Sequence, residues 1–290
     1  VAPVAQQLQL VFADEASKQI ASMRSPRFSP DGSKLVFLAT RDVATHNTAS
    51  LLALVDWTTK QTTTLIDLVQ EPESGYSHNP TMAFNGLFLG SLSKKAWSED
   101  GQFIFFDTQL GARTVWKYVD VQTKQIHHPA LVDGEKIAAE SVLDRTANGY
   151  FLVSVASPVR ASSVYLVQLD LSTGSYVRKP VAIVDQTDKA KYVGDWKLIS
   201  IPTSVSDTQP SSSSAAGVAH SDALQPHLLP QVASASDFEA SVWLPKSSPP
   251  AEGYPVVLDV HGGPHGNSPV TYRVMYEYIA ALGFAIVSVN

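Results

Sequence analysis

The sequence predicts a partial all-β propeller, with about three to four blades visible, followed by the start of an α/β domain. Three observations support this fold class. The first part of the chain repeats a strand-and-turn unit, a Ser-rich stretch interrupts it, and a strand–loop–helix–strand pattern follows. Of the 290 residues, 44% are apolar, close to the average for globular chains, and only 17% are charged, a combination that argues against disorder.

Composition excludes several classes of function. With 21 basic and 27 acidic residues the formal net charge is −6, so we expect no nucleic-acid partner. The absence of Cys excludes disulfides, Cys-ligated metal sites and a Cys nucleophile, and it favours a cytoplasmic location. No run of 18 apolar residues occurs, so we expect no membrane span. We expect no metal site and no cofactor.

The internal repeat predicts the propeller blades. Each copy opens on a tight turn, in which Gly accepts the positive φ that other residues avoid, and continues into an apolar strand. The last two copies are about 50 residues apart, a spacing typical of blades of four short strands. A fourth copy is expected around residues 194–200, and a β-sandwich with chance Asp-Gly turns is the alternative. The opening turns are residues 27–32 (RFSPDG), 96–101 (AWSEDG) and 144–149 (DRTANG).

A shift in composition predicts the domain boundary. Residues 203–236 contain nine Ser among 34 residues and neither Lys nor Arg, so this segment cannot bury a core and is expected to be a linker or loop. The predicted organisation is therefore propeller blades over residues 1–202, a linker over 203–236, and the first part of an α/β domain over 237–290.

The last segment reads as the beginning of a parallel sheet. Residues 238–244 alternate like a half-buried strand, whereas residues 255–260 and 284–289 are apolar enough for interior strands. A helix is predicted between them over residues 272–282. Its predicted buried side carries Tyr272, Met275, Tyr276, Ile279 and Leu282.

A His-Gly-Gly turn directly after a predicted buried strand indicates a catalytic loop. In α/β hydrolases this loop supplies backbone N–H groups that stabilise the oxyanion of acyl transfer, so we read the last segment as the start of an α/β-hydrolase domain. Gly263, with Gly262, is the predicted oxyanion-hole donor. His261 is expected to pack and form hydrogen bonds rather than act as a base, and His265 is a candidate for the substrate cleft. A tight βα connection without catalytic meaning is the alternative.

The chain resembles the acylaminoacyl-peptidases, a group within the prolyl oligopeptidase family of serine peptidases. The resemblance rests on residues 238–290, above all 261–265 (HGGPH) and 282–290 (LGFAIVSVN), and on residues 85–108. It implies a seven-bladed propeller joined to a catalytic α/β-hydrolase domain. It also implies release of an N-acylated amino acid from a peptide substrate, and it leaves open a homo-oligomer.

The nucleophile of such an enzyme is missing from the sequence. No Gly-x-Ser-x-Gly elbow occurs, and residues 266–270 (GNSPV) differ from this motif because the last position is not Gly. We therefore expect the Ser/Asp/His triad to lie beyond Asn290, and we expect these 290 residues alone to be inactive. Two alternatives remain: a dipeptidyl-peptidase or esterase of the same fold, and a non-enzymatic propeller scaffold that binds partners.

Overall fold

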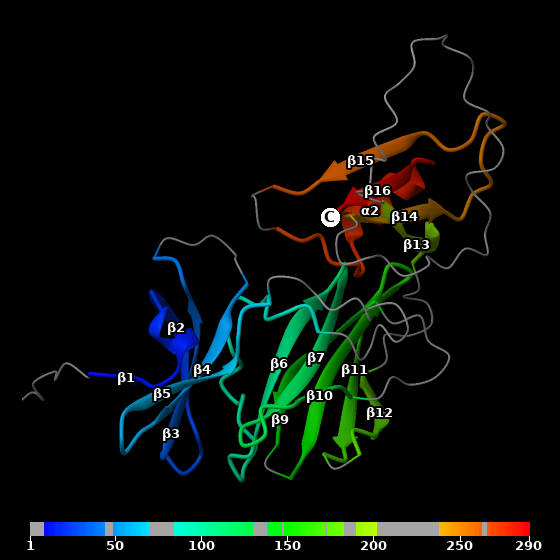
Figure 1. The fold of residues 1–290 in the computed structure, drawn as a ribbon. Coiled ribbons are helices and arrows are strands. Elements are labelled where there is room, and N and C mark those ends of the chain that lie inside the picture. Colours follow the sequence, from blue (N-terminus) through cyan, green and yellow to red (C-terminus); the bar gives the residue numbers. More distant parts are fainter. Residues whose placement is uncertain are drawn as a thin grey trace, which may run out of the picture.

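The computed structural model describes residues 9–43, 49–69, 84–129, 138–146, 148–171, 173–182, 190–201, 238–262 and 266–290. Its strands form three sheets, of five, seven and four strands. In the second sheet, six strands follow one hydrogen-bonded path and β8 pairs with β7 beside it. The first two sheets lie next to each other, and the third lies at the C-terminal end of the molecule (Figure 1). Only short helices accompany the strands in this part of the chain.

The first sheet is an antiparallel meander with one added parallel strand. Its order is β1-β5-β4-β3-β2, and β1 pairs with β5 in parallel. The sequence predicts a short helix near residues 11–20, but only a four-residue helix, α1 (Glu15–Lys18), forms there, because residues 11–12 join the sheet. The strands are β1 (Val11–Phe12), β2 (Ser22–Phe28), β3 (Lys34–Thr40), β4 (Leu51–Asp56) and β5 (Gln61–Ile66).

The second sheet joins two antiparallel groups of strands. The groups meet where β7 and β9 pair in parallel at a single position, Thr114 with Ala139. Trp97 forms an isolated bridge with Ile104, which adds a minimal first strand to the earlier group. The strands are β6 (Phe103–Leu110), β7 (Arg113–Asp120), β8 (Ile126–His127), β9 (Ala139–Arg145), β10 (Tyr150–Ser157), β11 (Arg160–Leu169) and β12 (Tyr176–Ala182).

The repeated sequences form the tight turns that the sequence predicts. In the first copy, Asp31 Oδ1 accepts hydrogen bonds from the Ser29 hydroxyl at 2.6 Å and from the Ser33 N–H at 3.0 Å. In every copy the last residue of the turn is a Gly with positive φ, a conformation that costs other L-residues roughly 1–2 kcal/mol. These glycines are Gly32 (φ 71°), Gly101 (φ 67°) and Gly149 (φ 77°).

Apolar clusters fill the space between these strand groups. Leu38 and Leu52 of the first sheet pack with Trp97, Ile104 and other buried residues that precede or form the second sheet. A second cluster, which includes buried Phe105, Trp116 and Phe151, joins the two groups of the second sheet. Facing sides of neighbouring strand groups are therefore buried against each other, as in stacked blades. The described residues do not close a ring.

The third sheet contains the strand–helix–strand unit that the sequence predicts. Its order is β13-β14-β16-β15, with β15 and β16 parallel and the other pairs antiparallel. The helix α2 (Val274–Ala281) connects β15 to β16 and packs on the sheet (Figure 1). The strands are β13 (Val193–Ile201), β14 (Phe238–Pro245), β15 (Val256–Val260) and β16 (Ala285–Val289).

Two expectations are corrected by the third sheet. The residues around 194–200, expected to begin a fourth blade within the first domain, form β13 and pair with β14 along its whole length. Strand β13 is therefore hydrogen-bonded within the third sheet and not to a strand of the first two sheets. The predicted buried side of α2 is also wrong in part, because Met275 and Leu282 are 65% and 59% exposed.

Candidate functional site

The loop with the His-Gly-Gly sequence begins at the carboxyl end of β15. His261 and Gly262 directly follow Val260, which pairs with Val289 at the end of the parallel strand β16. Ligands of α/β sheets bind outside this edge, at the carboxyl ends of parallel strands. Gly262 is exposed there, whereas Gly263 and His265 lie outside the described residues.

The two ends of this loop lie against each other. The His261 ring nitrogen Nδ1 is 3.1 Å from the Gly262 carbonyl oxygen. A Cβ atom built on Gly266 would lie 2.5 Å from the same Nδ1 and 2.7 Å from the Gly262 oxygen. Only a residue without a side chain fits at position 266, because the His261 ring and the Gly262 carbonyl occupy the space that a Cβ would need.

The helix α2 is tied to the end of β15 by three side chains. The Tyr276 hydroxyl donates a hydrogen bond to the Asp259 carboxylate, and Arg273 Nη1 lies 3.7 Å from Asp259 Oδ2. Arg273 also donates to the Tyr276 hydroxyl at 3.1 Å and to the Pro269 carbonyl at 3.2 Å. Burial, followed by the hydrogen bond to Asp259, raises the pKa of Tyr276, so this phenol stays protonated and serves as a donor.

Glu277 is a buried carboxylate that sequence reasoning missed. Its Oε2 accepts the N–H groups of Lys191 at 2.8 Å and Tyr192 at 3.0 Å, and its Oε1 accepts the Val193 N–H at 3.0 Å. The residue is only 7% exposed. Helical periodicity cannot reveal this role, because the partners lie about 85 residues away in the sequence.

The near-match to a nucleophile elbow is a structural segment. Ser268 is buried and precedes α2 in a loop, not at the strand-to-helix turn that an elbow needs. Its N–H donates to Asn290 Oδ1 at 2.6 Å, and its carbonyl accepts from Asn290 Nδ2 at 3.2 Å. This double contact fixes the loop to the end of β16.

No group of three or more potential metal ligands occurs among the described residues. The adjacent residues His127 and His128 do not share a site either. His127 stacks on Tyr118 at a centroid distance of 4.9 Å, whereas His128 contacts the Lys117 ammonium. Because Lys117 and Tyr118 are neighbours on one strand, the two imidazoles lie on opposite faces of the sheet. Burial, then the Lys117 charge, lowers the pKa of His128 to about 4.

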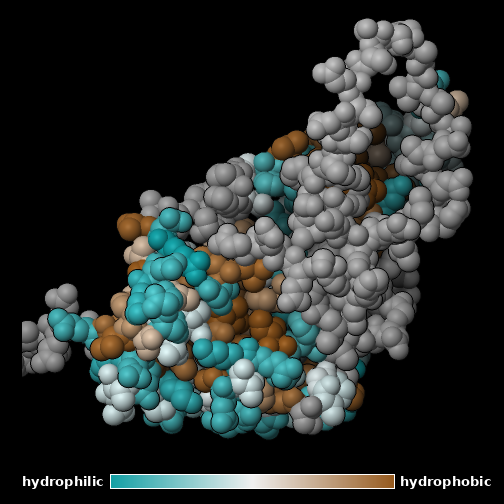
Figure 2. Space-filling model, viewed as in Figure 1, coloured by the Kyte–Doolittle hydropathy of each residue, from teal (hydrophilic) through white to brown (hydrophobic). Residues whose placement is uncertain are grey.

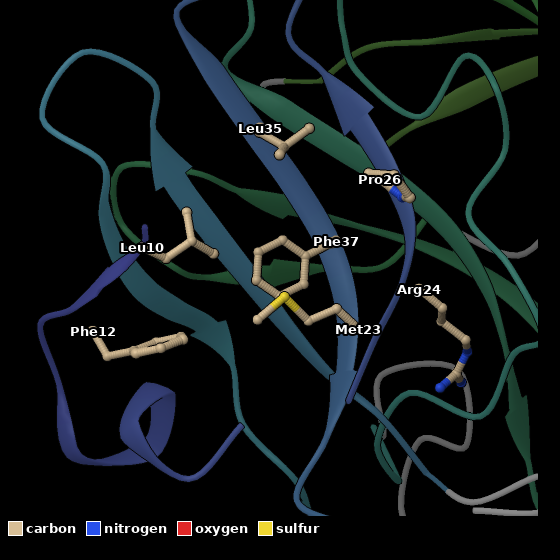
Figure 3. A pocket seen from close by; sticks show the side chains of 7 residues that line it. All are labelled: Leu10, Phe12, Met23, Arg24, Pro26, Leu35 and Phe37. Atoms are coloured by element: carbon tan, nitrogen blue, oxygen red, sulfur yellow. The ribbon is translucent and has the colours of Figure 1, made fainter. Parts of the chain in front are cut away.

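An apolar groove of about 500 Å³ lies on the first sheet, away from the His-Gly-Gly loop. Figure 3 shows the apolar side chains of the groove gathered together while Arg24 extends away from them. The Arg24 guanidinium donates to the Ser50 hydroxyl and to the carbonyls of Leu89 and Gly90. The groove therefore presents no group suited to acid–base or nucleophilic chemistry. Its lining is Leu10, Phe12, Met23, Arg24, Pro26, Leu35 and Phe37.

Apolar residues also reach the surface of the described strands. Figure 2 shows apolar side chains, in brown, reaching the surface among polar ones over the strand-rich part of the molecule. In the described part of the chain, no helix has the length and apolar character needed to cross a membrane.

Comparisons with known proteins agree with this fold. The acylamino-acid-releasing enzyme of Mus musculus is 27% identical over 276 residues, which cover 94% of this chain and 33% of the mouse protein. The chain thus spans about a third of the length of the curated relatives that it matches.

Two solved structures share the fold at low sequence identity. The acylaminoacyl peptidase of Pyrococcus horikoshii gives a TM-score of 0.52 at 12% identity, over 93% of this chain and 32% of that chain. A puromycin hydrolase gives a TM-score of 0.50 at 18% identity, over 93% of this chain and 42% of that chain.

A family model supplies the more specific match. The model, described as the N-terminal domain of acylamino-acid-releasing enzyme, matches residues 5–177. This match covers the first two sheets except for the part of β12 that follows residue 177. Because it covers more than half of the chain, the chain belongs to the acylamino-acid-releasing enzyme family.

Proposed function

We propose that the chain contributes propeller blades and the first catalytic-domain strands to a serine peptidase that releases N-acylated amino acids from peptides. One observation carries the proposal. In a chain of this family, a His-Gly-Gly loop begins at the carboxyl end of a parallel strand, where acyl-transfer enzymes place their oxyanion donors.

The proposed roles follow from the chemistry of acyl transfer. The carbonyl oxygen of the scissile bond becomes negative, and backbone N–H groups of Gly262 and Gly263 would stabilise it. His261 supports the base of the loop, and His265 is proposed to face the substrate. The Ser, Asp and His of the triad are proposed to belong to sequence outside these 290 residues, because no elbow motif occurs within them. Without them the 290 residues alone are proposed to be inactive.

The organisation of the proposed enzyme follows from the sheets. We place the strand-rich first domain up to β12 and the catalytic domain from β13 onward, with residues 202–237 as an insertion between β13 and β14. The substrate is proposed to be an N-acylated peptide in the cytoplasm, which the lack of Cys favours.

The first experiment is to read the transcript past the codon for Asn290. An in-frame Gly-x-Ser-x-Gly elbow with later Asp and His codons would support the peptidase. An immediate stop codon would overturn it and favour a binding scaffold instead.

The second experiment assigns the substrate. The complete gene product is assayed with acetyl-alanyl and free-amine dipeptide chromogenic substrates. Preferential cleavage of the acetylated substrate supports the proposal. Preference for the free amine would overturn it in favour of a dipeptidyl-peptidase, and cleavage of simple esters alone would favour an esterase.

A further inference from the structure

A hairpin of the second sheet reaches the third sheet through one peptide group. Leu110 and Arg113 pair at the ends of β6 and β7, so Gly111 and Ala112 form a two-residue turn. Gly111 has φ 56° at the first central position, as a type II′ turn requires. The peptide group between the two central residues takes no part in the hairpin ladder, yet Ala112 is completely buried. A buried peptide group needs hydrogen-bond partners from elsewhere.

Both partners come from the region around the proposed oxyanion loop. Glu239 Oε2, at the start of β14, accepts the Ala112 N–H at 2.6 Å. Asn267 Nδ2, just after the loop, donates to the Gly111 carbonyl at 3.0 Å. The two side chains therefore hold the N–H and the C=O of the same peptide group. The Val270 N–H adds a hydrogen bond of 2.7 Å to the Ala112 carbonyl.

The same contacts continue to the base of the loop. Asn267 follows Gly266, where an added Cβ would overlap the His261 ring. The next residue, Ser268, is bound twice by Asn290, and the Asn290 N–H donates to the Glu239 carbonyl at 2.8 Å. One end of the loop is thus fixed by β15, and the other end is fixed by Asn267 and the residues behind it.

We propose that Glu239 and Asn267 are positioning residues, which clamp the 111–112 peptide of the hairpin between β6 and β7 and thereby fix the two ends of the His-Gly-Gly loop, at Gly262 and Gly266. This inference rests on the proposed function. It assigns the hairpin between β6 and β7 a role in catalysis without contact with substrate, since the hairpin sets the location of the loop that would carry the oxyanion donors.

The contact with the Ala112 N–H needs a hydrogen-bond acceptor at position 239 more than it needs a negative charge. The carboxylate meets a neutral N–H, and burial raises the pKa of Glu239 while the Ala112 N–H and the Arg113 charge favour its ionised form. A glutamine keeps the shape and an acceptor oxygen for the Ala112 N–H. Glu239→Gln is therefore a conservative variant, whereas Glu239→Ala and Asn267→Ala each open one side of the clamp.

The test uses the complete gene product and two readouts. The first is steady-state hydrolysis of acetyl-alanyl p-nitroanilide and of p-nitrophenyl acetate. We expect Glu239→Ala and Asn267→Ala to lower kcat at least 10-fold with KM changed less than threefold, and Glu239→Gln to recover kcat to within threefold of wild type. Glu252→Ala, an exposed carboxylate in the turn after β14, is the matched control and should leave kcat unchanged.

The second readout needs no activity. Amide hydrogen exchange should show the Ser268 and Val270 amides protected in wild type and at least 10-fold less protected in both alanine variants. Unchanged kcat together with unchanged protection would overturn the clamp, and so would a fall in thermal stability with kcat per folded molecule unaltered. If wild type hydrolyses only the ester, the proposed substrate fails, but the variants still test the clamp through ester kcat and exchange.

Discussion

At the scale of single residues, Gly266 shows how a loop can depend on a missing side chain. The backbone at this position is so close to His261 that an added Cβ would lie within 2.5 Å of the ring nitrogen. The sequence shows Gly266 only as part of a near-elbow, and its steric role becomes visible only when residues 261 and 266 are placed side by side.

We expect Gly266→Ala to destabilise the protein by about 1–3 kcal/mol, the usual cost of forcing a group into an occupied space. The His261 ring must move away, so the loop should shift with it. The check is chemical denaturation of wild type and variant. Gly90→Ala is the matched control, because open space surrounds Gly90. Equal effects of the two substitutions would contradict the steric argument.

Asp107 is a half-buried carboxylate between two strand groups. Its Oδ1 accepts the Val142 N–H at 3.1 Å, and burial followed by the nearby Glu140 charge raises its pKa to about 7. A raised pKa means that the folded state holds a proton more tightly than the unfolded chain. The contribution of Asp107 to stability therefore falls as the pH rises from about 4 to about 7 and is constant above that range.

We expect Asp107→Asn to raise the free energy of unfolding by about 1–3 kcal/mol at pH 8 and to change it little at pH 4. The amide keeps an acceptor for the Val142 N–H and never ionises. Urea denaturation at several pH values measures the difference. Asp42→Asn, at an exposed position, serves as control. A difference between Asp107→Asn and wild type that is independent of pH would refute the expectation.

At the scale of elements, the strands and turns of the first two sheets could be predicted from the sequence because their signals are local. The turn at Asp31 and Gly32 needs only neighbouring residues, and its hydrogen bonds lie within five positions. The turn after Asp56 is equally local, because Asp56 Oδ1 accepts the N–H groups of Thr58 and Thr59. The partner of β13 could not be predicted, because 36 residues separate it from β14 in the sequence.

The helix α2 shows the limit of periodicity. An apolar side was predicted from spacing, yet the structure buries the charged Glu277 and exposes Met275. The reason is that three backbone N–H groups before and at the start of β13 need an acceptor, and Glu277 supplies it.

We expect Glu277→Ala to lower the free energy of unfolding by about 2–4 kcal/mol, since it leaves buried N–H groups without partners. Glu277→Gln, which keeps one acceptor oxygen, should cost less. Glu252→Ala at the surface should change stability by less than about 0.5 kcal/mol. A cost at Glu277 no larger than at Glu252 would mean that water replaces the carboxylate easily.

At the scale of the whole molecule, the third sheet presents an open apolar edge. Val256, Leu258 and Val260 of the edge strand β15 are 60%, 62% and 66% exposed on the side of the sheet opposite Asp259 and α2. Parallel sheets of α/β proteins are covered on both faces, and an uncovered apolar edge strand promotes association between chains.

We expect the 290-residue chain to self-associate at micromolar concentration and Leu258→Lys to increase the monomer fraction, as measured by analytical ultracentrifugation. Val43→Lys, at an apolar residue in the loop after β3 that is 82% exposed, is the control and should have little effect. Self-association that persists equally in both variants would show that β15 is not the contact.

The repeat of strands and turns, the strand–helix–strand unit and the position of the His-Gly-Gly loop after a strand can all be predicted from the sequence alone. Each of these depends on turn chemistry and side-chain patterning within a short stretch. Three other features are visible only in the folded molecule: β13 belongs to the third sheet, Glu277 is buried, and Glu239 and Asn267 bind one peptide of a distant hairpin. These features satisfy buried backbone groups across long sequence separations, and local patterns carry no information about them.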